Sequence, residues 1–106
     1  MIINNKHLNF RMYENLNRWK QSIMGNILVS AYVLLTVKTG KEYDVVDEIK
    51  KRVPMNKIRD ISIVYGMFDI VIAVDAHSLG DLERIVLEIR KIPYVSSTTT
   101  LVSAKT

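Results

Sequence analysis

The chain has 106 residues, 48% of them apolar, which supports one domain with a packed core but not two domains. It contains no cysteine, so a disulfide framework and a thiolate metal site are both excluded. The net charge of +4 is uneven: residues 1–26 carry four basic side chains and one acidic, whereas residues 27–106 carry eleven basic and ten acidic. Residues 27–106 are therefore nearly neutral, which does not favour binding to the phosphate backbone of nucleic acids.

The sequence also bears on the compartment. No apolar run reaches the length needed to span a bilayer. The first 20 residues lack the positive-then-apolar order of a secretory signal. These features predict a cytoplasmic protein.

The composition changes near residue 25, because six of the seven asparagines fall within residues 1–26. Five apolar side chains there follow the spacing of one helix face: Leu8, Met12, Leu16, Trp19 and Ile23. The pattern predicts an N-terminal extension over 1–26, with an amphipathic helix over 6–23, and a separate body over 27–106. Three interpretations of the extension stay open: a helix that packs on a neighbouring subunit, a basic arm that contacts nucleic acid, or a leader that precedes a natural start at Met24.

The first half of the body begins with a β-branched run that predicts a strand over 27–37. A helix is expected over 40–53, ended by Pro54. Its buried stripe is expected to consist of Tyr43, Val46, Ile49 and Val53.

The second half of the body continues with a strand over 57–65, a turn over 66–69 and a strand over 70–76. Ser78 and Asp81 have the spacing of a capping box, which predicts a helix over 79–91. Pro93 is expected to end this helix before a last strand over 94–103. The side chains expected to be buried on this helix are Leu82, Ile85, Val86 and Ile89.

The order βαββαβ predicts a ferredoxin-like α+β fold, in which a four-stranded antiparallel sheet carries both helices on one face. The other face should be polar in a monomer, but alternation along the first and third strands places apolar side chains on both faces. We therefore expect a homodimer, sheet against sheet, whose interface contains Tyr32, Leu34, Val71 and Ala73. The alternative is that the N-terminal helix folds back over its own sheet.

The turn between the second and third strands has an unusual composition: Gly66, Met67, Phe68 and Asp69. Glycine at this position permits a positive φ. A carboxylate at the start of a strand indicates hydrogen bonds, and Asp69 is equally compatible with a turn staple and with a ligand-binding role. The run SSTTT at 96–100 is typical of a strand, since threonine favours strands, but its hydroxyls also suit a ligand carboxylate.

The turn motif, the helix after it and the V-x-x-T-x-T pattern that opens the last strand together resemble a known family. Residues 28–104 are similar to the effector-binding RAM domain of the Lrp/AsnC (feast/famine) transcription regulators. The helix-turn-helix domain that normally precedes it is absent from these 106 residues, so the resemblance is to a stand-alone form without direct sequence-specific DNA binding.

The resemblance implies that the protein pairs through its sheets and assembles further into tetramers or octamers. It implies a small effector, usually an amino acid, at the interface between dimers, and possible co-assembly with a full-length regulator. The effector-binding residues carried over by position are Ile63, Gly66, Met67, Phe68 and Asp69, with Ser97, Thr98 and Thr99 from the neighbouring dimer.

Three other classes share this topology. A dimeric enzyme of the small monooxygenase or isomerase type needs a pocket with a histidine, tyrosine or acid pair, and no nucleophile–base pairing stands out, since His7 and His77 are isolated. An RNA-binding module needs aromatic and basic side chains on the open sheet face. A small-molecule module that resembles an ACT domain stays possible. We expect no enzymatic activity, no cofactor and no metal.

Overall fold

The computed structural model describes residues 28–103. The helix expected over 6–23 and the extension that contains it lie outside the described residues. Within them, four strands and two helices follow the predicted order, and a 3-10 turn (Met55–Lys57) precedes the second strand. The elements are β1 (Val29–Val37), α2 (Glu42–Arg52), β2 (Ile58–Ile63), β3 (Ile70–Ala76), α3 (Leu79–Arg90) and β4 (Val95–Val102).

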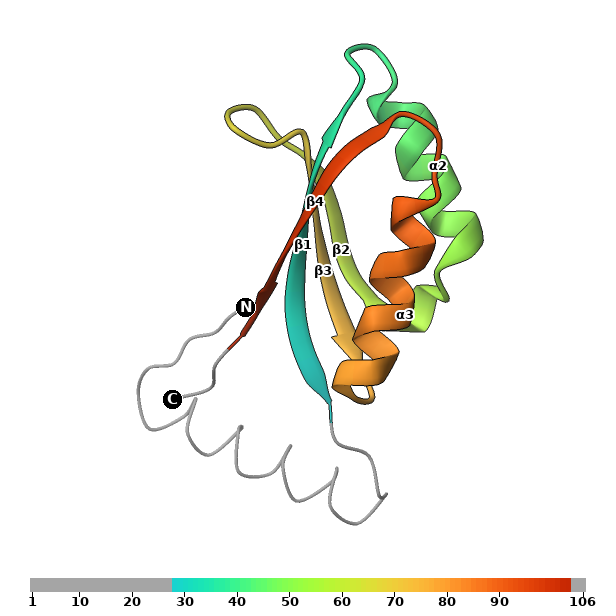
Figure 1. Ribbon diagram of the computed structural model, residues 1–106, viewed down its shortest axis with the longest axis vertical. Helices are drawn as coiled ribbons and strands as arrows, with labels where there is room; N and C mark the ends of the chain where they lie inside the picture. The colour runs from blue at the N-terminus through green and yellow to red at the C-terminus, as the bar shows by residue number, and fades with distance from the viewer. Residues whose placement is uncertain (1–27, 104–106) are drawn as a thin grey trace.

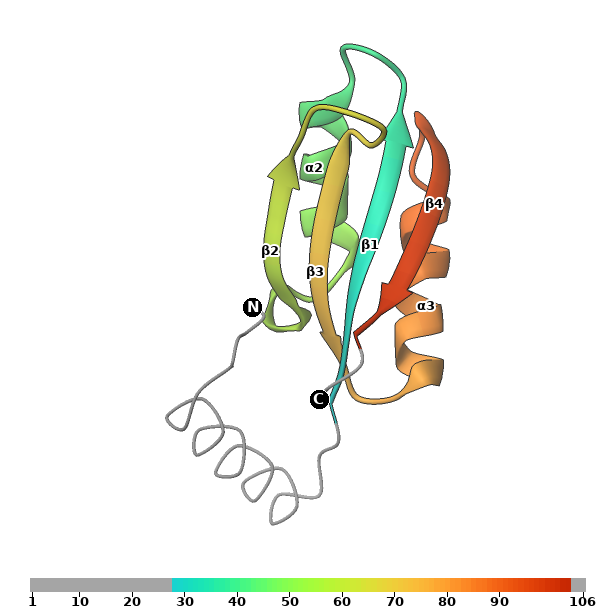
Figure 2. The same cartoon turned by 90° about the vertical axis from the view of Figure 1, so that its left-hand side faces the viewer.

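The four strands form one antiparallel sheet in the order β2-β3-β1-β4. Both helices pack on the same side of this sheet, which leaves the other side uncovered within residues 28–103 (Figure 1). Viewed from the uncovered side, β2 and β4 form the two edges (Figure 2). The predicted ferredoxin-like α+β fold is therefore confirmed.

The core lies between the sheet and the helices and is entirely aliphatic in the described residues. Side chains alternate across a strand, so every second residue of β1, starting at Ala31, points toward the helices and is buried. The same period on β3 buries Ile70, Ile72 and Val74. Burial of each large aliphatic side chain contributes about 1.5–3 kcal/mol, so this layer accounts for most of the stability of the fold.

The buried stripe of α2 differs from the prediction. Val45 and Ile49 are its fully buried residues, with Val53 buried just beyond the helix, whereas Tyr43 is 77% exposed. Val46, which was expected in the core, is only partly buried. The predicted stripe was displaced toward the exposed side because Val45 and Val46 are adjacent, and periodicity alone does not decide which of two neighbouring valines faces inward.

The start of α3 forms one half of the predicted capping box, because the Asp81 carboxylate accepts from the His77 amide rather than from the Ser78 amide. The Ser78 side chain accepts a hydrogen bond from the Asp81 amide at 3.0 Å, which satisfies one of the unpaired N–H groups of the first turn. Of the four apolar side chains predicted to be buried, Val86 is only partly buried and the other three are buried.

Substituting Ser78→Ala is expected to lower the free energy of unfolding by about 1 kcal/mol, because the Asp81 amide then loses its acceptor. Urea unfolding measures the change. Ser96→Ala, at an exposed position of β4, is the matched control and is expected to leave the unfolding midpoint unchanged. Equal midpoints for Ser78→Ala and wild type would contradict the capping role.

Candidate functional site

The loop between β2 and β3 projects from the end of the sheet and curves away from the helices (Figure 1). Gly66 has a φ of 133°, in the region that favours glycine, so it sets the direction of the loop. The tip is apolar and solvated: Tyr65 is 99% exposed and Met67 is 87% exposed. The strand predicted over 57–65 is shorter in the structure. It spans Ile58–Ile63, which leaves Tyr65 in the loop.

Asp69 anchors the base of this loop to β1. Its amide donates to the Leu35 carbonyl at 2.8 Å, and its carbonyl accepts from the Val64 amide at 2.9 Å. Its carboxylate Oδ2 accepts from the Val37 amide at 2.8 Å, next to the point where β1 shifts register against β4. Asp69 is therefore a staple between the loop and a neighbouring strand, which is one of the two roles left open by the sequence. Its ligand-binding role stays a prediction.

The hydroxyls of β4 divide between the two faces of the sheet. Thr99 pairs with Leu34, and Ser97 pairs with Thr36, so both lie on the uncovered face. Thr98 pairs with Leu35 and lies on the helix side. The predicted group Ser97, Thr98 and Thr99 therefore does not present its hydroxyls together on one face.

Thr36 lies at the end of the sheet that carries the Asp69 loop, and it is a polar residue that the sequence analysis missed. Its hydroxyl lies 2.6 Å from the Ser97 hydroxyl on the uncovered face. The strand order places β1 between the Asp69 loop and Ser97, so Thr36 stands between the two predicted halves of the site. Only the pairing of β1 with β4 reveals this neighbour, because the two hydroxyls are 61 residues apart in the sequence.

Ile63 takes a different position from the loop. It is partly buried and packs against the core on the helix side. Within one protomer, therefore, the structure brings Gly66, Met67, Phe68 and Asp69 together in one loop, and it holds Ser97 and Thr99 on the far side of β1.

The uncovered face has an apolar centre and polar ends. Two adjacent rows of paired residues form the centre: Val71, Leu34 and Thr99 in one row, and Ala73, Tyr32 and Leu101 in the next. All four residues predicted at the dimer interface lie in these rows. Beyond them, toward the end remote from the loop, Arg59 lies over the Tyr32 ring at 5.6 Å.

At the same polar end, Asp75 joins three strands. Its Oδ1 accepts from Arg59 Nε at 3.0 Å and from the Ser30 hydroxyl at 2.8 Å. The opposite end carries the Thr36–Ser97 hydroxyl pair. The face is thus suited to a partner that covers its middle and leaves its ends accessible to water.

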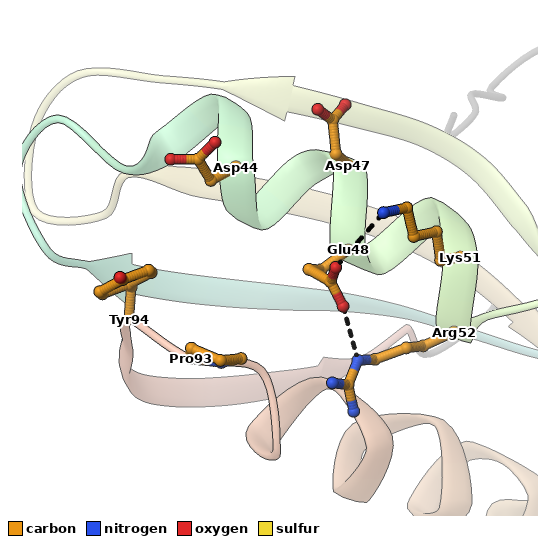
Figure 3. A pocket seen from close by; sticks show the side chains of 7 residues that line it. All are labelled: Asp44, Asp47, Glu48, Lys51, Arg52, Pro93 and Tyr94. Carbon is orange, nitrogen blue, oxygen red and sulfur yellow. Dashed lines mark hydrogen bonds and ion pairs between the residues drawn. The ribbon is translucent and has the colours of Figure 1, made fainter.

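A shallow hollow of about 420 Å³ lies on the helix layer, away from the predicted loop (Figure 3). Three of its charged side chains are paired with one another: Glu48 accepts from Arg52 Nε at 3.1 Å and lies 3.6 Å from Lys51 Nζ. The hydrogen bond from Arg52 lowers the pKa of Glu48. The lining residues are Asp44, Asp47, Glu48, Lys51, Arg52, Pro93 and Tyr94. None of the predicted site residues belongs to it, and its pairing pattern is that of a solvated surface.

An enzyme would need titratable or nucleophilic side chains in a pocket, and the described residues offer few of them. The core between helices and sheet is aliphatic, and its neighbour Asp81 is the one buried charged side chain described. Asp81 is held in an ion pair with Lys57, and His77 lies exposed at the corner before α3. In residues 28–103 no group of three or more metal-binding side chains is present, and no helix is long and apolar enough to cross a membrane.

Comparisons with known proteins agree with this architecture. The family model of the Lrp/AsnC ligand binding domain matches residues 30–106. The crystal structure of FFRP-DM1 is 30% identical, with a TM-score of 0.64, and the match covers 72% of this chain and 99% of that chain. The hypothetical protein PHS023 from Pyrococcus horikoshii is also 30% identical, with a TM-score of 0.61 and coverage of 74% and 92%.

A more distant structure shares the fold. The transcriptional regulator NMB0573 from Neisseria meningitidis, in its complex with L-Met, is 9% identical with a TM-score of 0.65, and the match covers 90% of this chain and 70% of that chain. A search of curated proteins gave no match. The family model covers most of the chain and the fold is that of the resembled domain, so this chain belongs to the Lrp/AsnC ligand-binding (RAM) domain family.

Proposed function

We propose that this protein senses a small effector, an amino acid, which binds where copies of the chain meet. Binding would shift the assembly state and so modulate a transcription regulator or amino-acid metabolism in the cytoplasm. The assembly would be a sheet-to-sheet dimer that associates further to a tetramer or octamer, alone or with a full-length relative.

The main support for this proposal is that β1 separates the two halves of the predicted site. The Asp69 loop and the hydroxyls of Ser97 and Thr99 lie on opposite sides of this strand, and we propose that the loop of one copy meets the hydroxyls of another. The loop supplies backbone amides and a carboxylate, and the hydroxyls supply further donors, which suits a ligand with one carboxylate and one ammonium group. The L-Met complex of NMB0573 supports an amino acid as the ligand class.

The match to FFRP-DM1 supports a role for the ligand-binding domain itself, because the match covers 99% of that chain. Aliphatic packing of the interior supports a sensor over an enzyme, because acid–base catalysis needs titratable groups in a pocket.

The test is a thermal-shift screen of the twenty amino acids, with mass measured in parallel by light scattering. A ligand at a hundredfold excess over its Kd stabilises the bound state by about 2.7 kcal/mol, which gives a rise in Tm of roughly 10 °C. The mass is expected to change at the same ligand concentration. If no amino acid changes Tm or mass, the sensing proposal is wrong.

Asp69→Asn is expected to weaken binding of the effective amino acid by about tenfold or more, because a charge-assisted hydrogen bond to the ammonium group is lost. Asparagine keeps an acceptor for the Val37 amide, so the loop staple is preserved. Isothermal titration measures the affinity. Asp47→Asn, at an exposed carboxylate of α2 on the helix side of the sheet, is the matched control and should bind as wild type. Unchanged affinity in Asp69→Asn would remove Asp69 from the site.

A further inference from the structure

The tip of the Asp69 loop is apolar, and its base carries one carboxylate. A hydrogen bond of 2.9 Å from the Val64 amide to the Asp69 carbonyl closes the loop. Three of the four residues that it encloses have large apolar side chains: Tyr65, Met67 and Phe68. Tyr65 and Met67 are exposed within the part of the chain that the structure describes. The loop therefore offers an apolar surface within a few residues of a carboxylate.

The hydroxyls of Thr36 and Ser97 offer a donor at the same end of the sheet. Their oxygens are 2.6 Å apart, so one hydroxyl donates to the other. Each hydroxyl carries one proton, which leaves the pair with one proton to donate to a third group. Asp69 is bonded to the two residues that flank Thr36, because its amide donates to the Leu35 carbonyl and its carboxylate accepts from the Val37 amide. Each copy thus carries, at one end of the sheet, partners for the ammonium and the carboxylate of an amino acid.

The charged side chains on the adjoining segments are engaged elsewhere. The ammonium groups of Lys38 and Lys41, which follow β1 in the chain, lie over the Tyr94 ring at 5.8 and 4.9 Å. On β2, the Asp60 carboxylate accepts from a serine hydroxyl of its own strand at 2.6 Å. Strand β4 has no charged residue, and the loop has none besides Asp69. The residues of the predicted site therefore hold no further charge for the side chain of a ligand.

We propose that the effector is an amino acid with an uncharged, apolar side chain, and that Met67 at the loop tip selects it. This inference rests on the proposed function and narrows its ligand class. The Cα atoms of Met67 and Asp69 are at most about 7 Å apart, since two residues separate them. The side chain of an amino acid begins two bonds from its ammonium nitrogen. A ligand whose ammonium group meets Asp69 therefore has its side chain within reach of the tip.

Selection follows from what the tip can offer to that side chain. Contact with an apolar side chain removes apolar surface of both groups from water, which favours binding. A charged side chain would lose part of its hydration at the same place and would meet no opposite charge. The tip therefore discriminates by the charge of the ligand side chain more strongly than by its shape.

The test compares ligands of similar length and different charge on the wild-type chain, by isothermal titration. Norleucine has the four-carbon side chain of lysine without its ammonium group, and methionine is similar in length to glutamate. The Kd of the apolar member of each pair is expected to be lower by about a hundredfold. Equal or tighter binding of lysine or glutamate would overturn this inference and leave the proposed sensing function intact. If none of the twenty amino acids or norleucine binds, both are wrong.

In the full chain, Met67→Glu is expected to reverse the preference between norleucine and lysine. The Kd for norleucine should rise about tenfold because an apolar contact is lost, and the Kd for lysine should fall about tenfold because its ammonium gains a carboxylate partner. Met67→Leu keeps the apolar surface and should keep the wild-type preference. Since Met67 is exposed within the described residues, the Tm of each variant without ligand should equal that of the wild type.

Met55→Glu is the matched control, because it makes the same change at another exposed methionine. Met55 lies in the 3-10 turn that precedes β2, whereas the loop follows β2, so the two methionines lie at opposite ends of the sheet. Both Kd values of Met55→Glu should equal those of the wild type. The selecting role of Met67 is wrong if Met67→Glu keeps the wild-type preference, if it weakens both ligands equally, or if Met55→Glu shifts the preference as much.

Discussion

Replacing Leu34 with aspartate is expected to convert the proposed sheet-to-sheet dimer into separate protomers. Leu34 lies at the centre of the apolar rows, on the inner strand β1, between Val71 and Thr99. It is half-buried within one protomer, so part of its surface remains for a partner to cover. A carboxylate there would lose its water on association without gaining a cationic neighbour.

The expected effect is large because symmetry doubles it. Each protomer brings one carboxylate to the interface and loses one aliphatic contact, which contributes about 1.5–3 kcal/mol when fully buried. An unpaired buried charge costs several kcal/mol more. Together these terms raise the Kd of the face dimer by about a thousandfold or more, since every 1.4 kcal/mol is a factor of ten.

Sedimentation equilibrium over a range of concentrations measures this change. Leu87→Asp is the matched control, because Leu87 is 49% exposed on α3, on the helix side of the sheet. Its Kd should equal that of the wild type. A monomeric wild-type chain, or a Leu34→Asp variant that stays dimeric with an unchanged circular dichroism spectrum, would contradict the face dimer.

The second large effect is expected from Asp81→Ala, which should lower the free energy of unfolding by about 3 kcal/mol. Asp81 is only 6% exposed, and its carboxylate accepts from Lys57 Nζ at 2.8 and 2.9 Å and from the His77 amide at 2.9 Å. Its removal leaves the Lys57 ammonium unpaired in a site that is mostly closed to water. Breaking a fully buried pair costs about 3–5 kcal/mol, and Lys57 keeps some contact with water, so the lower end applies.

The same carboxylate makes stability depend on pH. The hydrogen bond from Lys57, followed by that from the His77 amide, lowers the pKa of Asp81. A lowered pKa in the folded state means that the unfolded chain binds the proton more tightly. The contribution of Asp81 is therefore complete above the ordinary aspartate pKa of about 3.9 and is lost as the pH falls further, through the folded-state pKa.

Urea unfolding at pH 7 and at steps below pH 4 measures both effects. Asp81→Ala should be less stable than wild type at pH 7, and the difference should shrink in acid. Glu88→Ala is the control, because it removes the exposed pair with Lys91 and is expected to cost less than about 1 kcal/mol. Equal stability losses for the two variants would show that burial of the Asp81 pair contributes nothing.

The sequence by itself determined the element order, the fold class and the loop motif. The predicted strand over 70–76 agrees with β3 at both ends, and the Ser78–Asp81 cap is present, because both signals depend on residues close together in the chain. Binary patterning and capping are local properties, so one chain is enough to read them. The family resemblance is confirmed by the match over residues 30–106.

Only the tertiary structure decided which residues meet. Periodicity did not reveal that Val45 rather than Tyr43 faces the core, that Thr98 points to the helices, or that Asp69 holds the Val37 amide. Each of these depends on strand order and register, which bring together residues far apart in sequence. A shift of one residue reverses the face of every side chain in a strand, so the identity of the site rests on pairing that no local pattern encodes.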